Sequence, residues 1–385
     1  MELVARKGGM INMLKTYRYR IYPNKKQEEQ IQKTFGCCRF VYNQTLSYRK
    51  EMYETNGKSM SKYDCINYVC KVLKKQYEWL KDVDKWALEN SVKNMDAAYQ
   101  NFFNRKTGFP KFKEKRYTKK SYTTNCDKCG SGEKYNIEID TIKGMIKIPK
   151  VKWVKAKISR IFDGKIKSAT ISQVPSGKYF VSVLVEEKQE ERIKLNKKIG
   201  IDLGIKDLVI TSDGEKYNNP KIIKIYEKKL AKEQKRLCKK NKGSNNWEKQ
   251  RIKIARIYEK IHNSRVDNLH KISHKLINEN QVIVSEDLTV DNMMKNHNLS
   301  KAISDCGWYE LTRQIKYKSE WNGRSYIKIG KFVPTSQICN ICGYKNPDIK
   351  NLSIRKWICP KCGNMHDRDI NAAKNILNEG LKQIA

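Results

Sequence analysis

Two pairs of cysteines near the C-terminus constrain the fold of this chain more than any other feature. Each pair has the spacing Cys-x2-Cys, and the four ligands offered are Cys339, Cys342, Cys359 and Cys362. Two tight turns that each present two thiolates are typical of a tetrahedral zinc site, so we expect a zinc ribbon. The acidic motif His366-Asp367-Arg368-Asp369 follows almost at once. This proximity predicts that the ribbon is an insertion, placed just before an acid of another domain.

The charge of the chain predicts a polyanionic partner. Its 385 residues carry 80 Lys and Arg against 41 Asp and Glu, which gives a formal net charge of +39. Because such a chain repels itself unless a polyanion is bound, we expect nucleic acid as the partner. A basic membrane-surface protein is the alternative, but the sequence has no amphipathic anchor and no run of about 18 apolar residues. We therefore expect no membrane association.

The twelve cysteines do not indicate a disulfide-bonded secreted protein. Residues 1–12 contain no apolar signal segment and no cleavage site, so a reducing cytosol and metal ligation explain the cysteines better. We expect a cytoplasmic protein that associates with the nucleoid when it is bound to DNA. Regular patterning begins at Met13, which could be the functional start, and residues 1–12 are predicted to be a tail.

The first half of the chain predicts strands and helices in one unit. Residues 14–22 alternate like a half-buried strand. Helices are expected at 25–53, 61–75 and 87–103, the first with a buried stripe of Ile31, Phe35, Cys38 and Tyr42. Further strands are expected at 142–149, 154–158, 168–173 and 178–186. Together they predict a small β-barrel that carries a helical bundle.

The second half predicts a mixed α/β domain after a polar linker at 187–197. Buried strands are expected at 198–204, 208–211, 281–285 and 326–333, and helices at 308–321 and 369–381. Residues 221–260 carry 15 Lys and Arg against 4 Glu in two helical stretches. The inward side of the second helix is marked by Ile254, Ile257, Ile261, Leu269, Ile272 and Leu276. The other faces would offer a cationic surface to a nucleic-acid backbone.

Three acids stand out in this domain. Asp202 lies near the end of its first strand, Glu286 at the end of a later central strand, and Asp369 in the first turn of its last helix. A ribonuclease-H-like core assembles a two-metal site from such carboxylates, with ions about 3.5–4 Å apart that activate water and stabilise the leaving oxygen. Carboxylates suit Mg²⁺, and Mn²⁺ can replace it. Taken alone, Asp367 or Asp369 could equally be a helix cap.

Five motifs of the sequence resemble those of the TnpB (OrfB) proteins of bacterial insertion sequences, in the same order. They are Ile199-Gly-Ile-Asp-Leu-Gly-Ile-Lys206, Ser285-Glu-Asp-Leu288, Ser336-Gln-Ile-Cys339, Cys359-Pro-Lys-Cys362 and His366-Asp-Arg-Asp-Ile-Asn-Ala-Ala373. Tyr19-Arg-Ile-Tyr-Pro23 and Gly108-Phe-Pro-Lys-Phe112 extend the resemblance from about Met13 to the end. Members of this family are RNA-guided DNA nucleases and relatives of the type V CRISPR effectors.

The resemblance implies a wedge β-barrel with an inserted helical recognition bundle, followed by a RuvC nuclease domain with an inserted zinc-binding, target-loading domain. The implied boundaries are a tail at 1–12, the wedge at 13–24 and 111–190, the recognition bundle at 25–110, RuvC at 191–335 and 366–385, and the ribbon at 336–365. It further implies that Asp202, Glu286 and Asp369 are the catalytic metal ligands and that the four cysteines bind zinc. Asp367 is the less favoured third acid, because the family's catalytic carboxylate directly precedes x-Asn-Ala-Ala.

The resemblance also implies residues that read a short motif beside the DNA target. Lys85 lies in a matching segment, Val83-Asp-Lys-Trp-Ala-Leu88, and Tyr63, Thr124 and Asn125 are looser matches. Glu89 stands where a relative has glutamine, and an ionised carboxylate cannot donate hydrogen bonds, so the motif read here is expected to differ. Cys126-x2-Cys129 is an extra pair without a second pair nearby, and a lone pair only weakly indicates metal binding.

These inferences predict a guide-RNA-dependent, Mg²⁺-dependent DNA endonuclease whose partners are a transposon-end guide RNA, double-stranded target DNA and, in the same element, a companion transposase. Three alternatives remain open. A nuclease-dead RNA-guided repressor would be expected to lose acids of the triad, all of which are present. A cutting and joining transposase can share this nuclease fold. An actin-like ATPase opens with a similar strand, but it would explain neither the ribbon nor the charge.

Overall fold

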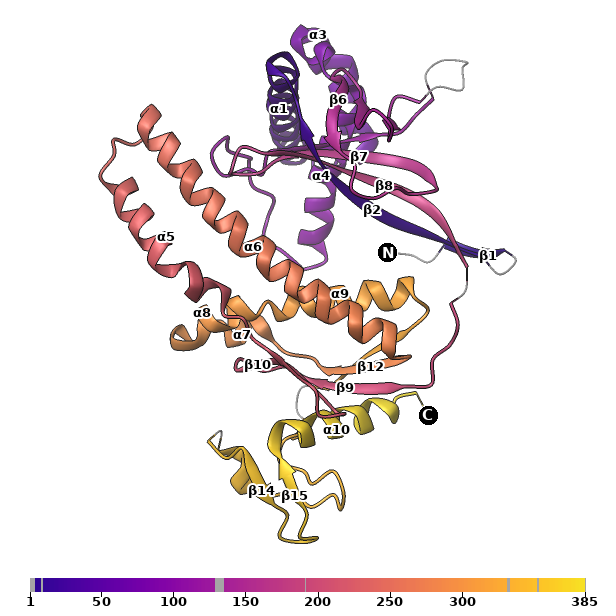
Figure 1. Ribbon diagram of the computed structural model, residues 1–385. Helices are drawn as coiled ribbons and strands as arrows, with labels where there is room; N and C mark the ends of the chain where they lie inside the picture. Colours follow the sequence, from indigo (N-terminus) through magenta and orange to yellow (C-terminus); the bar gives the residue numbers. More distant parts are fainter. Residues whose placement is uncertain are drawn as a thin grey trace. The chain divides into compact units, whose positions relative to one another are not determined.

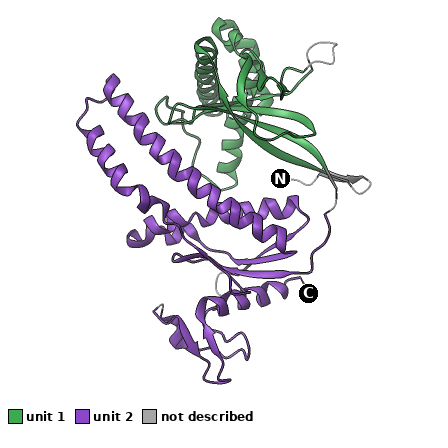
Figure 2. Cartoon of the chain, viewed as in Figure 1, with its two compact units in different colours: residues 1–189 green, residues 190–385 purple. Residues whose placement is uncertain are grey.

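The computed structural model describes residues 4–7, 10–128, 135–190, 192–330, 333–351 and 353–384. The chain divides into two compact units, Met1–Gln189 and Glu190–Ala385 (Figure 2). The division falls beside the boundary predicted at 190/191. Each unit has its own hydrophobic core, and each is described here by itself.

Unit 1 is built on a curled antiparallel sheet. Its strands follow the order β3-β7-β8-β2-β6-β5-β4, with β1 paired to β2. The strands are β1 (Val4–Lys7), β2 (Met10–Tyr22), β3 (Ser121–Asn125), β4 (Glu138–Asp140), β5 (Met145–Ile148), β6 (Lys152–Lys157), β7 (Lys165–Gln173) and β8 (Tyr179–Glu190). The two end strands of this order, β3 and β4, approach each other. The side chain of Asn136, just before β4, donates a hydrogen bond of 3.0 Å to the carbonyl oxygen of Asn125 at the end of β3. No ladder between β3 and β4 closes the barrel within the described residues.

The helices of unit 1 pack on one another and on this sheet (Figure 1). They are α1 (Lys25–Asn56), α2 (Lys62–Tyr68), a π-helical turn (Val69–Leu73), α3 (Lys74–Gln76), a 3-10 turn (Glu78–Asp82) and α4 (Lys85–Phe103). Asn24 begins α1 with a capping box that it shares with Gln27. The predicted stripe of Ile31, Phe35, Cys38 and Tyr42 is buried against the unit's core, as expected of an amphipathic helix.

Unit 2 contains a five-stranded mixed sheet in the order β11-β10-β9-β12-β13. Its strands are β9 (Lys198–Asp202), β10 (Asp207–Thr211), β11 (Lys216–Asn218), β12 (Val282–Glu286) and β13 (Ser325–Ile329). Strands β9, β12 and β13 run parallel, whereas β10 and β11 continue the sheet antiparallel. Strand β12 lies between β9 and β13 and is buried on both faces, which explains its apolar residues at 282–284.

Helices cover both faces of this sheet (Figure 1). The helices of unit 2 are α5 (Ile222–Cys238), α6 (Asn245–Glu279), α7 (Val290–Met293), α8 (His297–Cys306), α9 (Trp308–Trp321) and α10 (Arg368–Leu381). Helix α5 packs along α6 rather than on the sheet. Ile283 of β12 points to the cluster formed with α6 and α9, whereas Val282 and Val284 belong to the cluster of Ile376 on α10. This alternation follows from the two-residue period of a strand. The ribbon between β13 and α10 adds a 3-10 turn (Pro347–Lys350), β14 (Lys356–Ile358) and β15 (Met365–Asp367).

Several strands differ from the predicted elements. Strands β4, β11, β14 and β15 were not predicted, and three further differences follow. β2 begins at Met10, ahead of the predicted 14–22, and β1 lies in the predicted tail, where the two strands pair with each other. β3 was not predicted, because Ser121–Asn125 lacks an apolar alternation and owes its strand to pairing with β7. β13 ends at Ile329 rather than at Val333. None of the described helices is long and apolar enough to cross a membrane.

Candidate active site and zinc centre

The four cysteines gather into one cluster whose ligand atoms all lie within 4.8 Å of one another. Cys339 Sγ lies 3.6 Å from Cys362 Sγ, and Cys342 Sγ lies 3.5 Å from Cys359 Sγ. A tetrahedron of zinc–sulfur bonds near 2.3 Å has edges of roughly 3.8 Å, so the thiols fit a four-coordinate zinc ion. Within the described residues, they form the one group of three or more His, Cys, Asp and Glu side chains gathered this closely.

The two halves of the cluster have the same backbone. The N–H groups of Gly343 and Gly363 each donate over 2.9 Å to the carbonyl oxygen of the first cysteine of their pair, Cys339 and Cys359. Both glycines adopt positive φ, 73° and 67°, a conformation in which other residues are strained. The repeated turn therefore requires glycine directly after each Cys-x2-Cys, a local signal that strengthens the zinc prediction.

His366 supports the cluster from outside the predicted ligand set. Its Nε2 lies 3.1 Å from Cys339 Sγ, and its ring packs 4.8 Å from the ring of Trp357. A ring N–H that donates to a metal-bound thiolate orients the ligand and balances its charge. One feature of the sequence indicates this role: His366 comes four residues after the last cysteine, Cys362. The extra pair lies apart from this cluster in the sequence: Cys126 is half-buried, and Cys129 lies outside the described residues.

Asp202 and Glu286 end two neighbouring parallel strands. In the ladder between β9 and β12, Ser285 is paired with Ile201, so the next residues, Glu286 and Asp202, stand opposite each other. Residues opposite each other on paired strands point to the same face of the sheet. The two carboxylates therefore meet at the same edge.

Asp369 reaches the same edge from helix α10. The helix lies so close to β9 that a Cβ atom at Gly200 would meet the carbonyl oxygen of Ala373 at 2.1 Å. Further along, a Cβ at Gly380 would meet Val284 Cγ1 at 2.3 Å. Glycine on β9 and small residues on α10 thus permit the close packing that brings the first turn of the helix to the end of the strand.

The three acids interact electrostatically. Burial, followed by the negative charges of Glu286 and Asp369, raises the pKa of Asp202 to about 7. Like charges held together disfavour ionisation, whereas a bound cation would favour it. The site therefore holds more negative charge than the surrounding protein compensates at neutral pH.

Asp367 has a different environment from Asp369. Its Oδ1 accepts hydrogen bonds from the backbone N–H groups of Asp369 and Ile370, at 3.1 and 3.2 Å, and so caps α10. Its Oδ2 pairs with Lys216 Nζ at 2.7 Å. Burial alone would raise the pKa of Asp367, but Lys216 and the helix N–H groups hold it below its usual range. Asp367 is thus the cap of α10, and Asp369 is the acid whose negative charge helps to raise the pKa of Asp202.

Arg355 is a residue near the acids that the sequence pattern did not mark. Its Nη1 lies 3.4 Å from Asp369 Oδ1, and its carbonyl oxygen accepts a hydrogen bond of 2.9 Å from the backbone N–H of Arg368. The ribbon therefore supplies a cation to the carboxylate edge. No local motif distinguishes this arginine from the many others in the chain.

The residues predicted to read DNA lie on unit 1 in unlike settings. Tyr63 on α2 is 69% exposed, and Lys85 is exposed at the start of α4 with its Nζ 5.0 Å from the ring centroid of Trp86. Glu89, one turn further, pairs with Lys93 at 2.9 Å. Tyr63 and Lys85 are therefore both available to a ligand in solution.

Thr124 and Asn125 are tied to α4 instead. Thr124 is fully buried, and its Oγ1 donates over 2.7 Å to Oδ2 of Asp84, the N-cap of α4. The Asn125 side chain accepts a hydrogen bond of 3.1 Å from Asn90 on that helix. A direct DNA contact by Thr124 does not fit this burial. Its hydroxyl fixes the start of the helix that presents Lys85.

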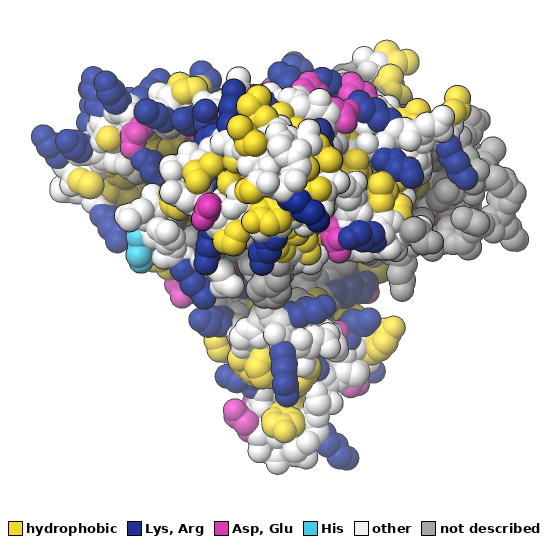
Figure 3. All heavy atoms as spheres, turned by 90° about the horizontal axis from the view of Figure 1, so that it is seen from below, with side chains coloured by type: hydrophobic (Ala, Val, Ile, Leu, Met, Phe, Trp, Pro, Cys, Tyr) yellow, Lys and Arg dark blue, Asp and Glu magenta, His cyan; other side chains and the backbone are white. Residues whose placement is uncertain are grey.

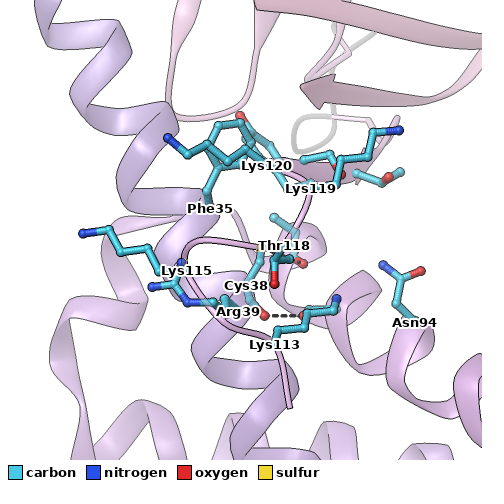
Figure 4. A pocket seen from close by; sticks show the side chains of 14 residues that line it. Phe35, Cys38, Arg39, Asn94, Lys113, Lys115, Thr118, Lys119 and Lys120 are labelled. Carbon is cyan, nitrogen blue, oxygen red and sulfur yellow. Dashed lines mark hydrogen bonds between the residues drawn. The ribbon is translucent and has the colours of Figure 1, made fainter. Parts of the chain in front are cut away.

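A basic pocket of about 310 Å³ lies beside the same helix (Figure 4). Apolar side chains of Phe35, Cys38 and Tyr122 form part of its wall, and no acidic side chain lines it. Its cations are Arg39, Lys113, Lys115, Lys119 and Lys120. Figure 4 shows Lys119 and Lys120 at one end and the other three cations at the other.

Lys113 is the most constrained of these cations. Asn43 brackets its backbone, accepting from its N–H at 2.8 Å and donating to its carbonyl oxygen at 3.0 Å. Its Nζ lies 3.8 Å from the ring centroid of Tyr42, and burial lowers its pKa. Because no carboxylate lines the pocket, the desolvated ammonium would be stabilised by an anionic ligand. Lys and Arg side chains also dominate the charged groups on the face shown in Figure 3.

Family models match three stretches of the chain. Residues 180–297 match OrfB_IS605, described as "Probable transposase", residues 308–376 match "Cas12f1-like, TNB domain", and residues 10–58 match a "Helix-turn-helix domain". In the structure, residues 10–58 form strand β2 and the single long helix α1, not two helices joined by a turn.

Similar proteins extend over nearly the whole chain. A protein of Streptomyces pristinaespiralis named "Putative RNA-guided DNA endonuclease" is 34% identical over 376 residues, which cover 97% of this chain and 90% of the relative. "Putative RNA-guided DNA endonuclease InsQ" of Escherichia coli (strain K12) is 31% identical over 393 residues, with 97% and 94% covered. The fold resembles that in the "Cryo-EM structure of the Cas12f1-sgRNA-target DNA complex", with a TM-score of 0.64, 13% identity, and 95% and 99% of the two chains covered.

Proposed function

Because this chain belongs to the TnpB family of insertion-sequence proteins, we propose that it is an RNA-guided DNA endonuclease that cleaves DNA beside a short flanking motif. The observation that carries the proposal is the meeting of Asp202, Glu286 and Asp369 at one edge of the unit 2 sheet. The strand order β11-β10-β9-β12-β13, with β9 at the centre, supports the predicted ribonuclease-H-like core.

The acids fit divalent cations by their donor chemistry. Carboxylate oxygens are the ligands that Mg²⁺ and Mn²⁺ prefer. The pKa of Asp202 is raised first by burial and then by the charges of Glu286 and Asp369, and a bound cation would offset both effects. Asp202, Glu286 and Asp369 would hold the two ions, which supply Lewis-acid activation of water and neutralise charge at the phosphate. Asp367 would keep the first turn of α10 in place.

Arg355 would act on the substrate side of this site. Its side chain is 58% exposed and its Nη1 lies close to Asp369, so the guanidinium remains available to a phosphate. A fixed cation beside a phosphodiester stabilises the negative charge that develops during its hydrolysis. We assign Arg355 to this role, in addition to its contact with the third acid.

The implied domains correspond to structural parts as follows. The curled sheet of unit 1 would be the wedge, and the helices from α1 to α4 the recognition bundle. Unit 2 would be the RuvC domain, with the ribbon at 336–365 as the target-loading insertion and the basic helices α5 and α6 at about 221–260 along the nucleic acid. The four cysteines would hold zinc, because their spacing and geometry fit that ion.

Unit 1 would read the flanking motif and hold the nucleic-acid backbone. Lys85 and Tyr63 would contact the DNA, and Thr124 and Asn125 would position α4 through Asp84 and Asn90. The pocket around Lys113 would take a backbone phosphate, of the guide RNA or of the DNA. Glu89 pairs with Lys93, as expected of an ionised carboxylate, which cannot donate hydrogen bonds to a base. This supports a flanking motif that differs from the one read by a relative with glutamine at this position.

The proposal is tested by purifying the protein with RNA co-expressed from its transposon end, sequencing that RNA, and supplying a DNA library with randomised flanks and Mg²⁺. We expect cleavage only of targets that match the guide, next to one enriched flank. Cleavage without RNA would refute guiding. Strand joining instead of cutting would favour a transposase, and tight guided binding without cutting would favour a repressor.

The phosphate pocket makes a separate prediction. Arg39→Gln and Lys113→Met should each weaken binding several-fold and lower the slope of log affinity against log salt by about 1, because one phosphate contact is lost. Measuring the guide RNA and the flank duplex separately identifies which backbone occupies the pocket. Lys81→Met is the matched control, because Lys81 is exposed and already pairs with Glu78. An equal loss in the control would show that only net charge matters.

A further inference from the structure

The segment that begins the zinc ribbon touches the carboxylate site directly. Thr335 is 5% exposed, and its Oγ1 donates a hydrogen bond of 2.5 Å to Oε1 of Glu286 at the end of β12. Glu286 lies on a strand and Thr335 on a loop, 49 residues apart in the chain. This hydroxyl therefore restrains the side chain of one of the proposed metal ligands from outside its own strand.

The same segment is fastened to helix α10. The side chain of Asn375 donates to the carbonyl oxygens of Thr335 and Ile338, at 2.7 and 2.6 Å. One turn earlier, the Asn371 side chain donates to Ile338 O at 2.7 Å and accepts from the backbone N–H of Asn340 at 3.0 Å. Both asparagines follow Asp369 on its helix. The segment 335–340 thus bridges the elements that carry Glu286 and Asp369.

The ribbon's metal cluster holds the other end of this segment. Cys339 lies within it, and its Sγ is 3.6 Å from that of Cys362, which lies in the turn between β14 and β15. Zinc at the four thiols would close the loop from Cys339 to Cys362 and so fix the backbone to which Thr335 belongs. Without this anchor, the segment would be held by the bonds of Asn371 and Asn375 and by the bond of Thr335 to Glu286.

We propose that Thr335 is a positioning residue for Glu286, and that segment 335–340 makes the first half of the zinc ribbon a structural part of the carboxylate site. This inference rests on the proposed function, because it assumes that Glu286 binds a catalytic ion. It explains why the insertion follows β13 and precedes α10: both of its ends adjoin the acids. The ribbon has a structural task at the acids in addition to any contact with nucleic acid.

Thr335→Val tests the proposal because it keeps the shape of the side chain and removes the hydroxyl. We expect Mn²⁺ binding to the RNA-loaded protein, measured by electron paramagnetic resonance, to weaken about tenfold, as is typical when a partner of a metal ligand is lost. The half-saturating Mg²⁺ concentration for cleavage should rise in parallel. Thr335→Ser should restore both. Zinc content should remain that of the wild type.

A matched control and a double mutant separate positioning from general destabilisation. Thr312→Val removes a hydroxyl that bonds only its own helix, at Tyr309 O, and should leave Mn²⁺ binding unchanged. If Asn375 acts through Thr335, Asn375→Ala combined with Thr335→Val should weaken Mn²⁺ binding by less than the product of the two single effects. Independent, multiplicative effects would refute the link through segment 335–340.

The two proposals fail in distinguishable ways. If Glu286→Gln and Asp202→Asn leave Mn²⁺ binding and cleavage intact, the carboxylate site itself is wrong. If those variants lose both properties while Thr335→Val binds Mn²⁺ like the wild type, only the role of Thr335 is wrong. A Thr335→Val protein that is thermally weaker but binds Mn²⁺ normally would overturn the inference in the same way, because it would leave Thr335 a purely structural role.

Discussion

Asp202→Asn should abolish DNA cleavage and, in the same variant, make the metal-free protein more stable at neutral pH. The loss of cleavage is expected to exceed about a thousandfold, because one of the three proposed metal ligands is removed. The gain in stability follows from the geometry of the site. Asparagine keeps the shape of the side chain and removes a buried negative charge that Glu286 and Asp369 repel.

The direction of the pH dependence follows from the raised pKa of Asp202, about 7 in the folded chain. An unfolded aspartate has a pKa near 3.9, so between about pH 4 and 7 the folded protein binds the extra proton. The stability that this proton confers is complete below about pH 4 and is lost as the pH rises through about 7. At pH 8, the wild type should therefore be weaker than Asp202→Asn by roughly 2–4 kcal/mol, or several degrees in melting temperature.

Thermal unfolding in EDTA across pH 4–8 measures this difference, and Mg²⁺ titration at pH 8 measures its reversal. The wild type should gain stability on adding Mg²⁺, whereas Asp202→Asn should gain little. Asp267→Asn is the control, because Asp267 is an exposed acid of α6 paired with Lys271. If Asp202→Asn and the control melt alike at every pH, the three acids do not repel one another and the site is not assembled as described.

Much of unit 2 could be predicted from local patterns. Helix α9 occupies the predicted 308–321, and β9, β10 and β12 lie within two residues of their predicted bounds. Buried strands and amphipathic helices have a periodic pattern of apolar residues over a short stretch of chain. A single sequence is therefore enough to predict them. The motif around Gly200 was visible too, although its reason, the close approach of Ala373, needed the structure.

Contacts between distant segments could not be predicted in this way. Thr335 and Glu286 are 49 residues apart, and Arg355 meets Asp369 across the ribbon's hairpin. No periodicity links such residues, because tertiary packing alone brings them together. The same limit applies to Thr124, whose burial under α4 depends on an unpredicted strand, β3.

Cys359→Ser should release zinc and unfold the ribbon while leaving unit 1 folded. The ribbon has a very small core: apart from the cysteines, its buried cluster holds Ile349 and Trp357, with Ile354 packed against them. Burial of so few apolar side chains cannot offset the conformational entropy that the segment loses on folding. The metal must therefore supply the remaining free energy of folding. Structural zinc in comparable small domains supplies on the order of 10 kcal/mol.

The consequence of zinc loss should extend from the ribbon to the acids. With Cys339 no longer anchored to Cys362, segment 335–340 loses its attachment to the metal cluster, and Arg355 loses its place beside Asp369. We therefore expect DNA cleavage by Cys359→Ser to fall more than about a hundredfold, as for loss of both a metal-ligand partner and a charge-stabilising donor. Binding of the guide RNA should change far less, because the phosphate pocket belongs to unit 1 and the basic helices α5 and α6 lie outside the ribbon.

Zinc per chain by elemental analysis, guide-RNA binding and cleavage are the three measurements for this variant. Cys238→Ser is the matched control: Cys238 is exposed at the end of α5 and should leave all three unchanged. One zinc retained per chain in Cys359→Ser would contradict the four-thiol site. Loss of zinc with normal cleavage would instead mean that α10 and β12 hold Asp369 and Glu286 in place without the ribbon. This variant therefore measures how far the position of the proposed catalytic acids depends on the zinc site.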